Sequence, residues 1–305
     1  MPNMSDIVSP DKRTPGIVAI DPVLFPILEK LYDRRLQRLN VLATKQEENG
    51  EYFRFLSHLV HAQKHILEHM PLDQPNRRAI LGLFSHGLDS ELLEDSLASI
   101  TCWQNAYTTL LQQISAFLPS PIQQNLTELA ADKPRLIRAA TDLLWSQYQQ
   151  VNAGAAVVLW AALSICWAQA VATQQEEAVT QPIGAAVCCP CCHAPPVGSL
   201  VLGGAREGLR YLQCSLCETR WHRVRAVCVD CGASDKIDHW TLDDAKSPIQ
   251  IETCGDCKGY IKTFRLDYDP ELEAMADDLG SFSLDNAIEE NGFMRIGINP
   301  FSFPA

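Results

Sequence analysis

Apolar residues recur at helical spacing through the first half of the chain. Asp21-Pro22 is a helix start signal, a capping side chain followed by proline, and Leu24, Leu28 and Leu31 continue the pattern toward Leu39. A second apolar stripe consists of Phe55, Leu59, Ala62 and Ile66. This stripe predicts a helix over about residues 51–70. Further apolar segments, separated by Pro, Gly and polar breaks, lie near residues 92–118, 122–131, 134–150 and 155–173. We therefore expect antiparallel helices packed into one bundle-like domain over residues 1–180.

The most apolar stretch of the chain runs from Ala155 to Ala172. Its length is marginal for a membrane span, which needs roughly 20 mostly apolar residues. Ser164 and Gln169 interrupt it, and the flanking residues 174–177 offer no basic anchor. The pattern favours a buried core helix over membrane insertion.

The character of the chain changes after Thr173. Residues 173–184, TQQEEAVTQPIG, are polar and end in Pro and Gly, which is typical of a linker. Ten of the twelve cysteines lie beyond it, among glycines and short alternating runs. This composition predicts small β units held together by metal ions.

Four Cys-x-x-Cys pairs occur between residues 189 and 257. A pair at this spacing forms a knuckle, a turn that presents two thiolates to one ion and directs backbone N–H groups at the sulfurs. Two knuckles complete a tetrahedral site. We predict two such sites, one of Cys189, Cys192, Cys214 and Cys217, and the other of Cys228, Cys231, Cys254 and Cys257.

Sequential pairing of the knuckles follows from what lies between them. In each half, two short apolar runs flank a polar turn, residues 203–208 in the first and 243–248 in the second, and a further strand follows the second knuckle. We expect tandem rubredoxin-like ribbons over residues 185–226 and 227–268. Interleaved pairing, in which the ribbons exchange knuckles, is the alternative.

The first knuckle has two possible registers because Cys188, Cys189, Cys191 and Cys192 form overlapping pairs. We choose Cys189 and Cys192, since Pro190 then follows the first ligand. Cys188 and Cys191 are then spare thiols, either small residues that fill the knuckle or a reactive group beside the metal.

In the C-terminal segment, residues 269–305, the apolar spacing predicts one more helix after Asp269-Pro270. A tail that contains Pro and Phe follows this helix. Two carboxylate pairs, Asp243-Asp244 and Asp277-Asp278, are expected on solvated turn and helix faces.

Four histidines, His58, His61, His65 and His69, follow one side of the helix predicted over residues 51–70. Spacings of four residues would allow metal binding. The stripe borders the apolar face and lacks an HExxH pattern, so the polar flank of an amphipathic helix is favoured.

Charge and composition narrow the functional classes. A formal net charge of -12 disfavours a general nucleic-acid binder, although Arg220, Arg223 and Arg225 form a local basic cluster that is a candidate for partner binding. The N-terminus shows no secretory signal, so we expect a cytoplasmic protein with reduced, metal-binding cysteines. No P-loop, GxSxG or dinucleotide motif is present, and we assign no catalytic residues. Four thiolates suit zinc and iron equally.

The chain resembles the FdhE family, the formate dehydrogenase accessory proteins, over nearly its whole length. The matching segments are DPVLFPILEKLYDRRLQRL, CPCCHAPPVGS, GLRYLQCSLCETRWHRVRAVCVDCG, HWTLDD, ETCGDCKGYIK, ADDLGSFSLD and INPFSFP. His193 departs from the family pattern, since the usual knuckle has Gly at this position, where a positive φ is expected.

The resemblance implies a non-enzymatic factor for maturation of respiratory formate dehydrogenase. It implies binding of the catalytic subunit in the cytoplasm before export, and rubredoxin-like iron in place of zinc at the eight cysteines. The expected fold is α+β, a mainly helical N-terminal domain followed by two tandem four-cysteine ribbons and a C-terminal helical tail. The alternative functions are a rubredoxin-like electron carrier or redox sensor, and a zinc-ribbon nucleic-acid binder.

Overall fold

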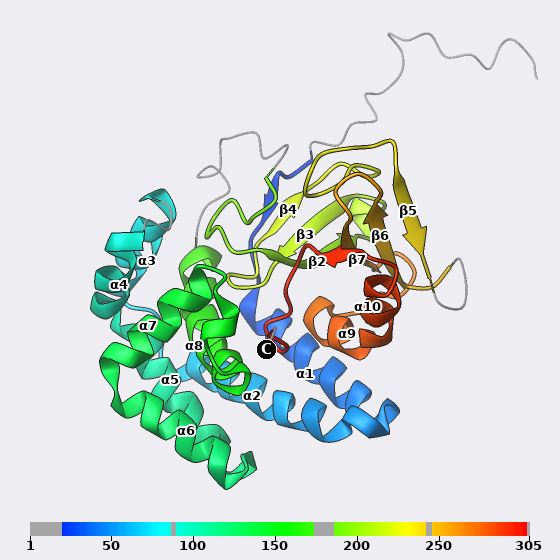
Figure 1. Cartoon of the computed structure of the whole chain (residues 1–305). Helices are drawn as coiled ribbons and strands as arrows, with labels where there is room; N and C mark the ends of the chain where they lie inside the picture. Colours follow the sequence, from blue (N-terminus) through cyan, green and yellow to red (C-terminus); the bar gives the residue numbers. More distant parts are fainter. Residues whose placement is uncertain (1–19, 87–89, 174–185, 242–245, 304–305) are drawn as a thin grey trace, which may run out of the picture.

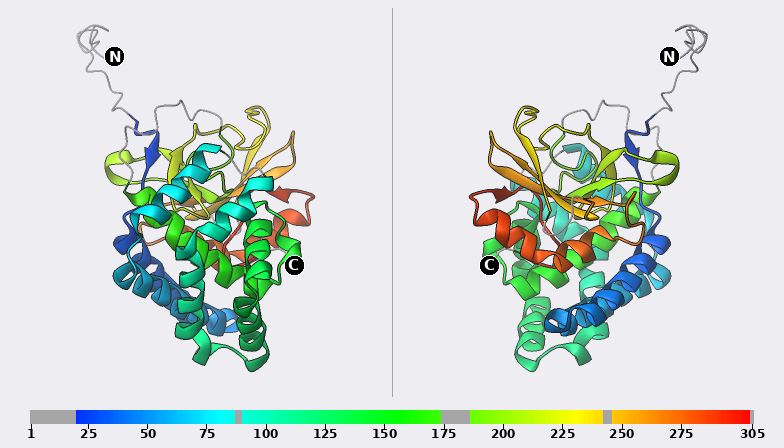
Figure 2. Two further views of the ribbon diagram at one scale, coloured as in Figure 1. Left: turned by 90° about the vertical axis from the view of Figure 1, so that its left-hand side faces the viewer. Right: turned by 90° about the vertical axis from the view of Figure 1, so that its right-hand side faces the viewer.

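The computed structural model describes residues 20–86, 90–173, 186–241 and 246–303. The predicted linker, apart from Thr173, and the pair Asp243-Asp244 lie outside these residues. A layer of helices forms one side of the molecule and a twisted sheet covers one end of it (Figures 1 and 2).

The N-terminal part is helical, as the apolar spacing predicts. Helices α1 and α2 pack against each other, and α2 coincides closely with the predicted range. The bounds are α1 Leu28–Lys45, α2 Gly50–His69, α3 Gln74–His86, α4 Ser90–Ser99, α5 Thr101–Ile114, α6 Ser120–Ala131, α7 Lys133–Leu144 and α8 Ala153–Ala172.

Helix α8 is the central helix of the molecule. It is long and apolar enough to cross a membrane, but 94% of its most apolar window is buried inside the protein. Helices α1, α2, α3, α5, α6 and α7 all contact it. The prediction of a buried core helix is therefore confirmed.

The predicted start of the first helix at Asp21-Pro22 is wrong. Val23–Leu24 form a short strand, β1, antiparallel to β4 (Arg220–His222), and α1 begins only at Leu28. The backbone N–H of His222 donates to the carbonyl of Pro22. Pairing with a strand about 200 residues away overrides the local start signal, and Pro26 disfavours helical geometry at the residue before it.

Both predicted ribbons are present as antiparallel three-stranded units. The first consists of β2 (Pro196–Val201), β3 (Arg210–Cys214) and β4, and the second consists of β5 (Ile237–Trp240), β6 (Ile249–Cys254) and β7 (Gly259–Arg265).

The two ribbons are halves of one sheet. Strands β2 and β7 pair in parallel, with Ser199 opposite Thr263, so the strand order is β1-β4-β3-β2-β7-β6-β5. Arg210 of β3 crosses this joint, donating to Ser199 Oγ and pairing with Glu252 of β6 at 2.8 Å. The sequence repeat did not predict this union. The division of the chain into domains at residues 1–180, 185–226, 227–268 and 269–305 stays a prediction.

The C-terminal segment forms two helices where one was predicted, α9 (Ala274–Gly280) and α10 (Phe282–Glu289), followed by strand β8 (Met294–Arg295) beside β7. The prediction that the Asp277-Asp278 pair is solvated is also wrong, because both residues are only 2% exposed. Asp277 pairs with Arg38 and Asp278 with Arg295. These ion pairs attach α9 to α1 and to β8, which explains how the carboxylates are accommodated.

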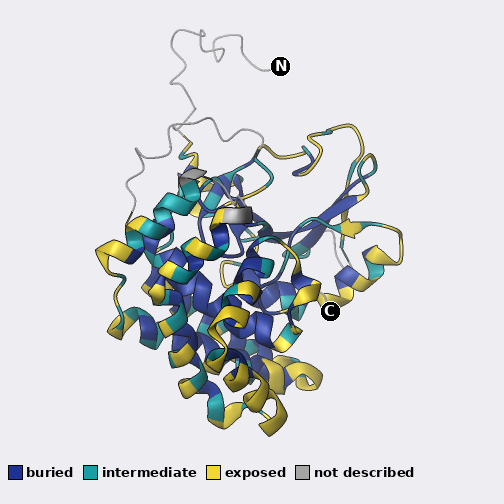
Figure 3. Ribbon diagram, turned by 60° about the vertical axis from the view of Figure 1, so that its left-hand side comes forward, coloured by how far each residue is buried: buried dark blue, intermediate teal, exposed yellow. Residues whose placement is uncertain are grey.

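The tail returns to the helical core. The Phe303 ring lies 5.3 Å from that of Trp160 and 5.4 Å from that of Tyr148. The Tyr52 hydroxyl donates to the Phe301 carbonyl at 2.5 Å. Buried residues concentrate between the helices and the sheet, and exposed ones lie on outward helical faces (Figure 3). The molecule is thus a helical part followed by a sheet-rich part, as expected.

Candidate metal centres

The structure brings the eight predicted cysteines into two groups of four, paired sequentially. Within each group the sulfur atoms all lie within 4.8 Å of one another. Neighbouring sulfurs are 3.4–3.6 Å apart. These separations exclude disulfide bonds, in which sulfurs are about 2.05 Å apart. Sulfurs about 2.3 Å from a central tetrahedral ion lie about 3.8 Å from one another, so each group could bind one metal ion.

The first group lies inside the main hydrophobic core. Its four cysteines are at most 4% exposed. Helix α8 holds the second knuckle directly, because Trp160 Nε1 donates to the Ser215 carbonyl at 2.9 Å and Ser164 Oγ to the Leu216 carbonyl at 2.7 Å. The packing of the apolar helix therefore positions Cys214 and Cys217.

The second group lies nearer the surface, at the far end of the sheet from β1. Cys228 and Cys254 are buried, Cys257 is half-buried and Cys231 is exposed. The apolar residues Val229, Ile237 and Ile261 lie beside Cys228 and Cys254. The two candidate centres thus share a donor set but differ in access to solvent.

All four knuckles share one backbone feature. The residue after each second cysteine has a positive φ: His193 (61°), Glu218 (64°), Gly232 (77°) and Lys258 (60°). The turn closes by a hydrogen bond back to the first cysteine, as from His193 N to the Cys189 carbonyl at 3.0 Å. The positive φ expected at His193 is confirmed, and its Nε2 lies 3.1 Å from the Phe84 carbonyl oxygen.

Backbone N–H groups point at the sulfurs, as a thiolate site requires. The amides of Leu216 and Cys217 each lie 3.3 Å from Cys214 Sγ. Burial opposes ionisation of Cys214, but hydrogen bonds from the neighbouring thiols and Leu216 lower its pKa well below the ordinary value. In the second group burial likewise opposes ionisation of Cys254, and the amides of Cys257 and Asp256 help to lower its pKa.

The spare thiols occupy different settings. Cys191 is buried and its amide donates to Cys189 Sγ at 3.4 Å, so it is part of the knuckle. Cys188 is exposed, and partial burial of its thiol raises its pKa. Neither belongs to the group of four, in agreement with the register chosen.

The three arginines of the basic cluster, Arg220, Arg223 and Arg225, differ in burial and in their hydrogen-bond partners. Arg223 is 4% exposed and donates to the carbonyls of Cys228 and Val229, so it supports the third knuckle. Arg220 is half-buried and donates from Nε to Gln213 Oε1. Arg225 is exposed. Their role in partner binding stays a prediction.

The histidine stripe lies along an outer flank of α2. His65 and His69 stack with ring centroids 4.2 Å apart, and His58 stacks on Phe117. Among the described residues, the groups able to hold a metal ion are the two cysteine groups. The placement fits the favoured interpretation of a polar flank.

Sequence reasoning missed a buried ion cluster beside the first centre. Arg35 of α1, 1% exposed, pairs with Glu218 in the second knuckle and with Glu273 before α9, each at 2.8 Å. Burial raises the pKa of Glu218, and Arg35 opposes the rise. The position of Arg35 on the core-facing side of a predicted helix was the sequence feature that could have indicated this cluster.

Comparisons with known proteins agree along the whole chain. Three family models match, FdhE N-terminal over residues 20–183, FdhE central domain over 188–225 and FdhE C-terminal domain over 226–302. Protein FdhE of Escherichia coli K12 is 37% identical over 305 residues, covering 98% of this chain and 96% of that protein. The Protein FdhE homolog of Proteus mirabilis is 37% identical, covering 95% and 94%.

A solved structure matches as well. The crystal structure of the FdhE protein from Pseudomonas aeruginosa superposes with a TM-score of 0.79 at 30% identity, covering 93% of this chain and 99% of that one. Sequence, fold and cysteine pattern lead to one conclusion: the chain belongs to the FdhE family.

Proposed function

We propose that this protein is a non-enzymatic accessory factor that binds the catalytic subunit of formate dehydrogenase in the cytoplasm, before export. Membership of the FdhE family over the full chain is the observation that carries the proposal. Support comes from the first candidate centre, because its four cysteines are at most 4% exposed and lie in the main hydrophobic core, as expected of a structural site.

We propose further that each cysteine group holds one iron ion, with zinc as the alternative. Thiolate-bound iron would supply a one-electron couple, whereas zinc would be structural only. Metal analysis of protein purified without oxygen distinguishes the two. Two irons per chain and a visible thiolate-to-iron absorption support the iron assignment, and two zincs in a colourless protein would rule it out.

The loop after β4 is the proposed contact with the partner. Val224 is 60% exposed and Arg225 beside it is exposed, whereas Arg223 is buried and donates to the carbonyls of Cys228 and Val229. Arginine is enriched at protein interfaces and among the residues that contribute most to binding. We expect Arg225→Glu to weaken binding of the catalytic subunit without loss of metal.

Affinity capture of the catalytic subunit, with its export signal intact, tests the proposal. The full chain is expected to retain the subunit, and formate dehydrogenase activity is expected to disappear in cells that lack this protein and to return with the wild-type chain. Cys231→Ser removes a ligand of the second group and is expected to weaken retention of the subunit, and Cys102→Ser, which alters a cysteine outside both groups, is its matched control. Failure of the intact protein to retain the subunit would contradict the docking role.

An electron carrier is the second candidate function. The exposure of Cys231 favours it, because a centre near the surface is accessible to an electron donor or acceptor. An absorption band that bleaches on reduction and returns on oxidation, together with full dehydrogenase activity in cells lacking the protein, would favour the carrier over the accessory role.

A further inference from the structure

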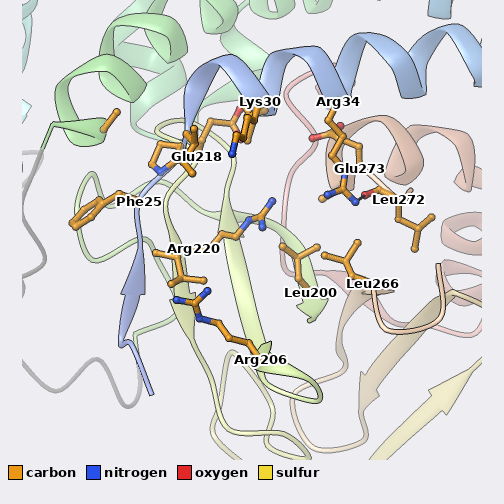
Figure 4. Close-up of a pocket in the computed structure, with 16 residues that line it drawn as sticks. Phe25, Lys30, Arg34, Leu200, Arg206, Glu218, Arg220, Leu266, Leu272 and Glu273 are labelled. Atoms are coloured by element: carbon orange, nitrogen blue, oxygen red, sulfur yellow. Dashed lines mark hydrogen bonds between the residues drawn. The ribbon is translucent and has the colours of Figure 1, made fainter. Parts of the chain in front are cut away.

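A cavity of about 670 Å³ lies between the start of α1, the first ribbon and the segment before α9. Its volume is in the range of small-molecule sites. Figure 4 shows Lys30 and Arg34 projecting from α1, Arg220 reaching in from β4, and Leu200 and Leu266 across from them. The cavity lies beside the buried ion cluster and does not include any of the eight cysteines.

The charges that face this cavity do not balance. Two carboxylates line it, Glu218 and Glu273, and they share one cation, Arg35. Four further cations, Lys30, Arg34, Arg206 and Arg220, line the same walls, and of these Arg206 pairs with Asp21. Among the residues that the structure describes, no carboxylate forms an ion pair with Lys30, Arg34 or Arg220.

Arg220 carries the strongest part of the argument. Its Nε donates to Gln213 Oε1 at 3.2 Å, and its remaining nitrogens extend toward the cavity (Figure 4). Burial, reinforced by the charge of Arg34, lowers its pKa, so the surroundings disfavour this cation as they stand. Arg34 donates from Nη2 to the carbonyls of Pro270 and Leu272, which fixes it at the rim of the cavity. Two guanidinium groups are thus held in place before any ligand binds.

The first turn of α1 adds to the positive potential. Ile27 occupies the N-cap without a capping side chain, and residues 26 and 27 line the cavity. The N-terminal end of a helix favours an anion by its dipole and its free N–H groups. The apolar part of the wall includes Phe25, Leu200 and Leu266.

We propose that this cavity binds a small organic phosphate, with the phosphate between Lys30, Arg34 and Arg220 and the apolar body against Phe25, Leu200 and Leu266. Three cations suit a dianion better than a single carboxylate, and guanidinium groups bind phosphate oxygens in bidentate fashion. The proposal does not depend on the accessory function.

Phenyl phosphate is the test ligand, titrated into the full chain by calorimetry in buffer free of phosphate. It is expected to bind more tightly than inorganic phosphate, because the apolar wall contacts the ring, and phenol is expected not to bind. Absence of heat and of any thermal stabilisation at about 5 mM phenyl phosphate, where a millimolar site would be mostly filled, would overturn the proposal.

Substitutions of cavity residues test whether phenyl phosphate binds at this position. Arg220→Gln and Lys30→Gln are each expected to weaken phenyl phosphate binding about ten-fold or more. Lys30 is exposed, so its replacement leaves the core intact, and Lys45→Gln at the other end of the same helix is the matched control. Wild-type affinity in both cavity variants would refute the assignment. A glutamate peptide that binds as tightly as phenyl phosphate would refute a small-molecule site in favour of a protein partner.

Discussion

One residue in each knuckle adopts the left-handed conformation, yet only Gly232 among the four is a glycine. The other three carry side chains that make contacts elsewhere: His193 to Phe84, Glu218 to Arg35, and Lys258 over the Phe293 ring. A left-handed non-glycine residue costs about 1–2 kcal/mol, so these contacts offset a local strain.

Two variants at His193 distinguish the effect of backbone strain from the effect of the side-chain contact with Phe84. Both His193→Ala and His193→Gly lose the Phe84 interaction, but only glycine relieves the positive φ. The glycine variant is therefore expected to be more stable than the alanine variant by about 1 kcal/mol in urea unfolding of the metal-loaded protein. Equal stability of the two variants would show that the turn is not strained.

Arg35 is the shared counterion of two carboxylates, Glu218 and Glu273, that are at most 5% exposed. Arg35→Met leaves Glu218 and Glu273 buried without their counterion, and we expect a loss of about 3–5 kcal/mol in the free energy of unfolding. Adding Glu218→Gln is expected to restore part of this loss. Arg78→Met, at an exposed position, serves as control. An unchanged unfolding midpoint for Arg35→Met would contradict the ion cluster.

At the scale of elements, the two centres differ in what surrounds them. The first is enclosed by α8 and the main core, and the second has the exposed Cys231 at its edge. Metal must leave the first site through local opening of the core, which requires free energy that the second site does not need.

A chelator is therefore expected to remove the two ions in separate phases. We expect the second site to empty first, at least about ten-fold faster, which corresponds to about 1.4 kcal/mol of additional opening free energy for the first. Cys231→Ser should abolish the fast phase and Cys192→Ser the slow one. A single phase, or the reverse assignment, would show that exposure does not control release.

Elements defined by local spacing were predictable and those defined by distant pairing were not. The knuckles follow from two cysteines three residues apart, and α2 from an apolar stripe, so sequence alone located Cys189 and Phe55 correctly in their elements. Strand β1 depends on β4, far along the chain, and its local signal predicted a helix. Asp278 was misassigned because its partner, Arg295, lies in another element.

At the scale of the whole molecule, segments far apart in the sequence complete both the sheet and the helical core. The parallel β2–β7 pairing unites the ribbons, and the tail residues Phe301 and Phe303 close the helical core from the other side. The family motif that contains these phenylalanines therefore has a structural role.

Phe303 tests the importance of this closure. It is 7% exposed against Trp160 and Tyr148, and Phe303→Ala is expected to lower the free energy of unfolding by about 3–5 kcal/mol. Urea unfolding measures the change. Phe117→Ala, at a ring that is 48% exposed, is the control and is expected to have a much smaller effect. A similar loss in both variants would contradict a special role for the tail.

The return of the tail has a consequence for biosynthesis. The hydroxyl of Tyr52 meets the carbonyl of Phe301, a residue made 249 positions later. Phe303, which covers the Trp160 ring, is likewise made long after α8. During translation the aromatic surface around Trp160 therefore lacks these two covering residues until synthesis has passed them.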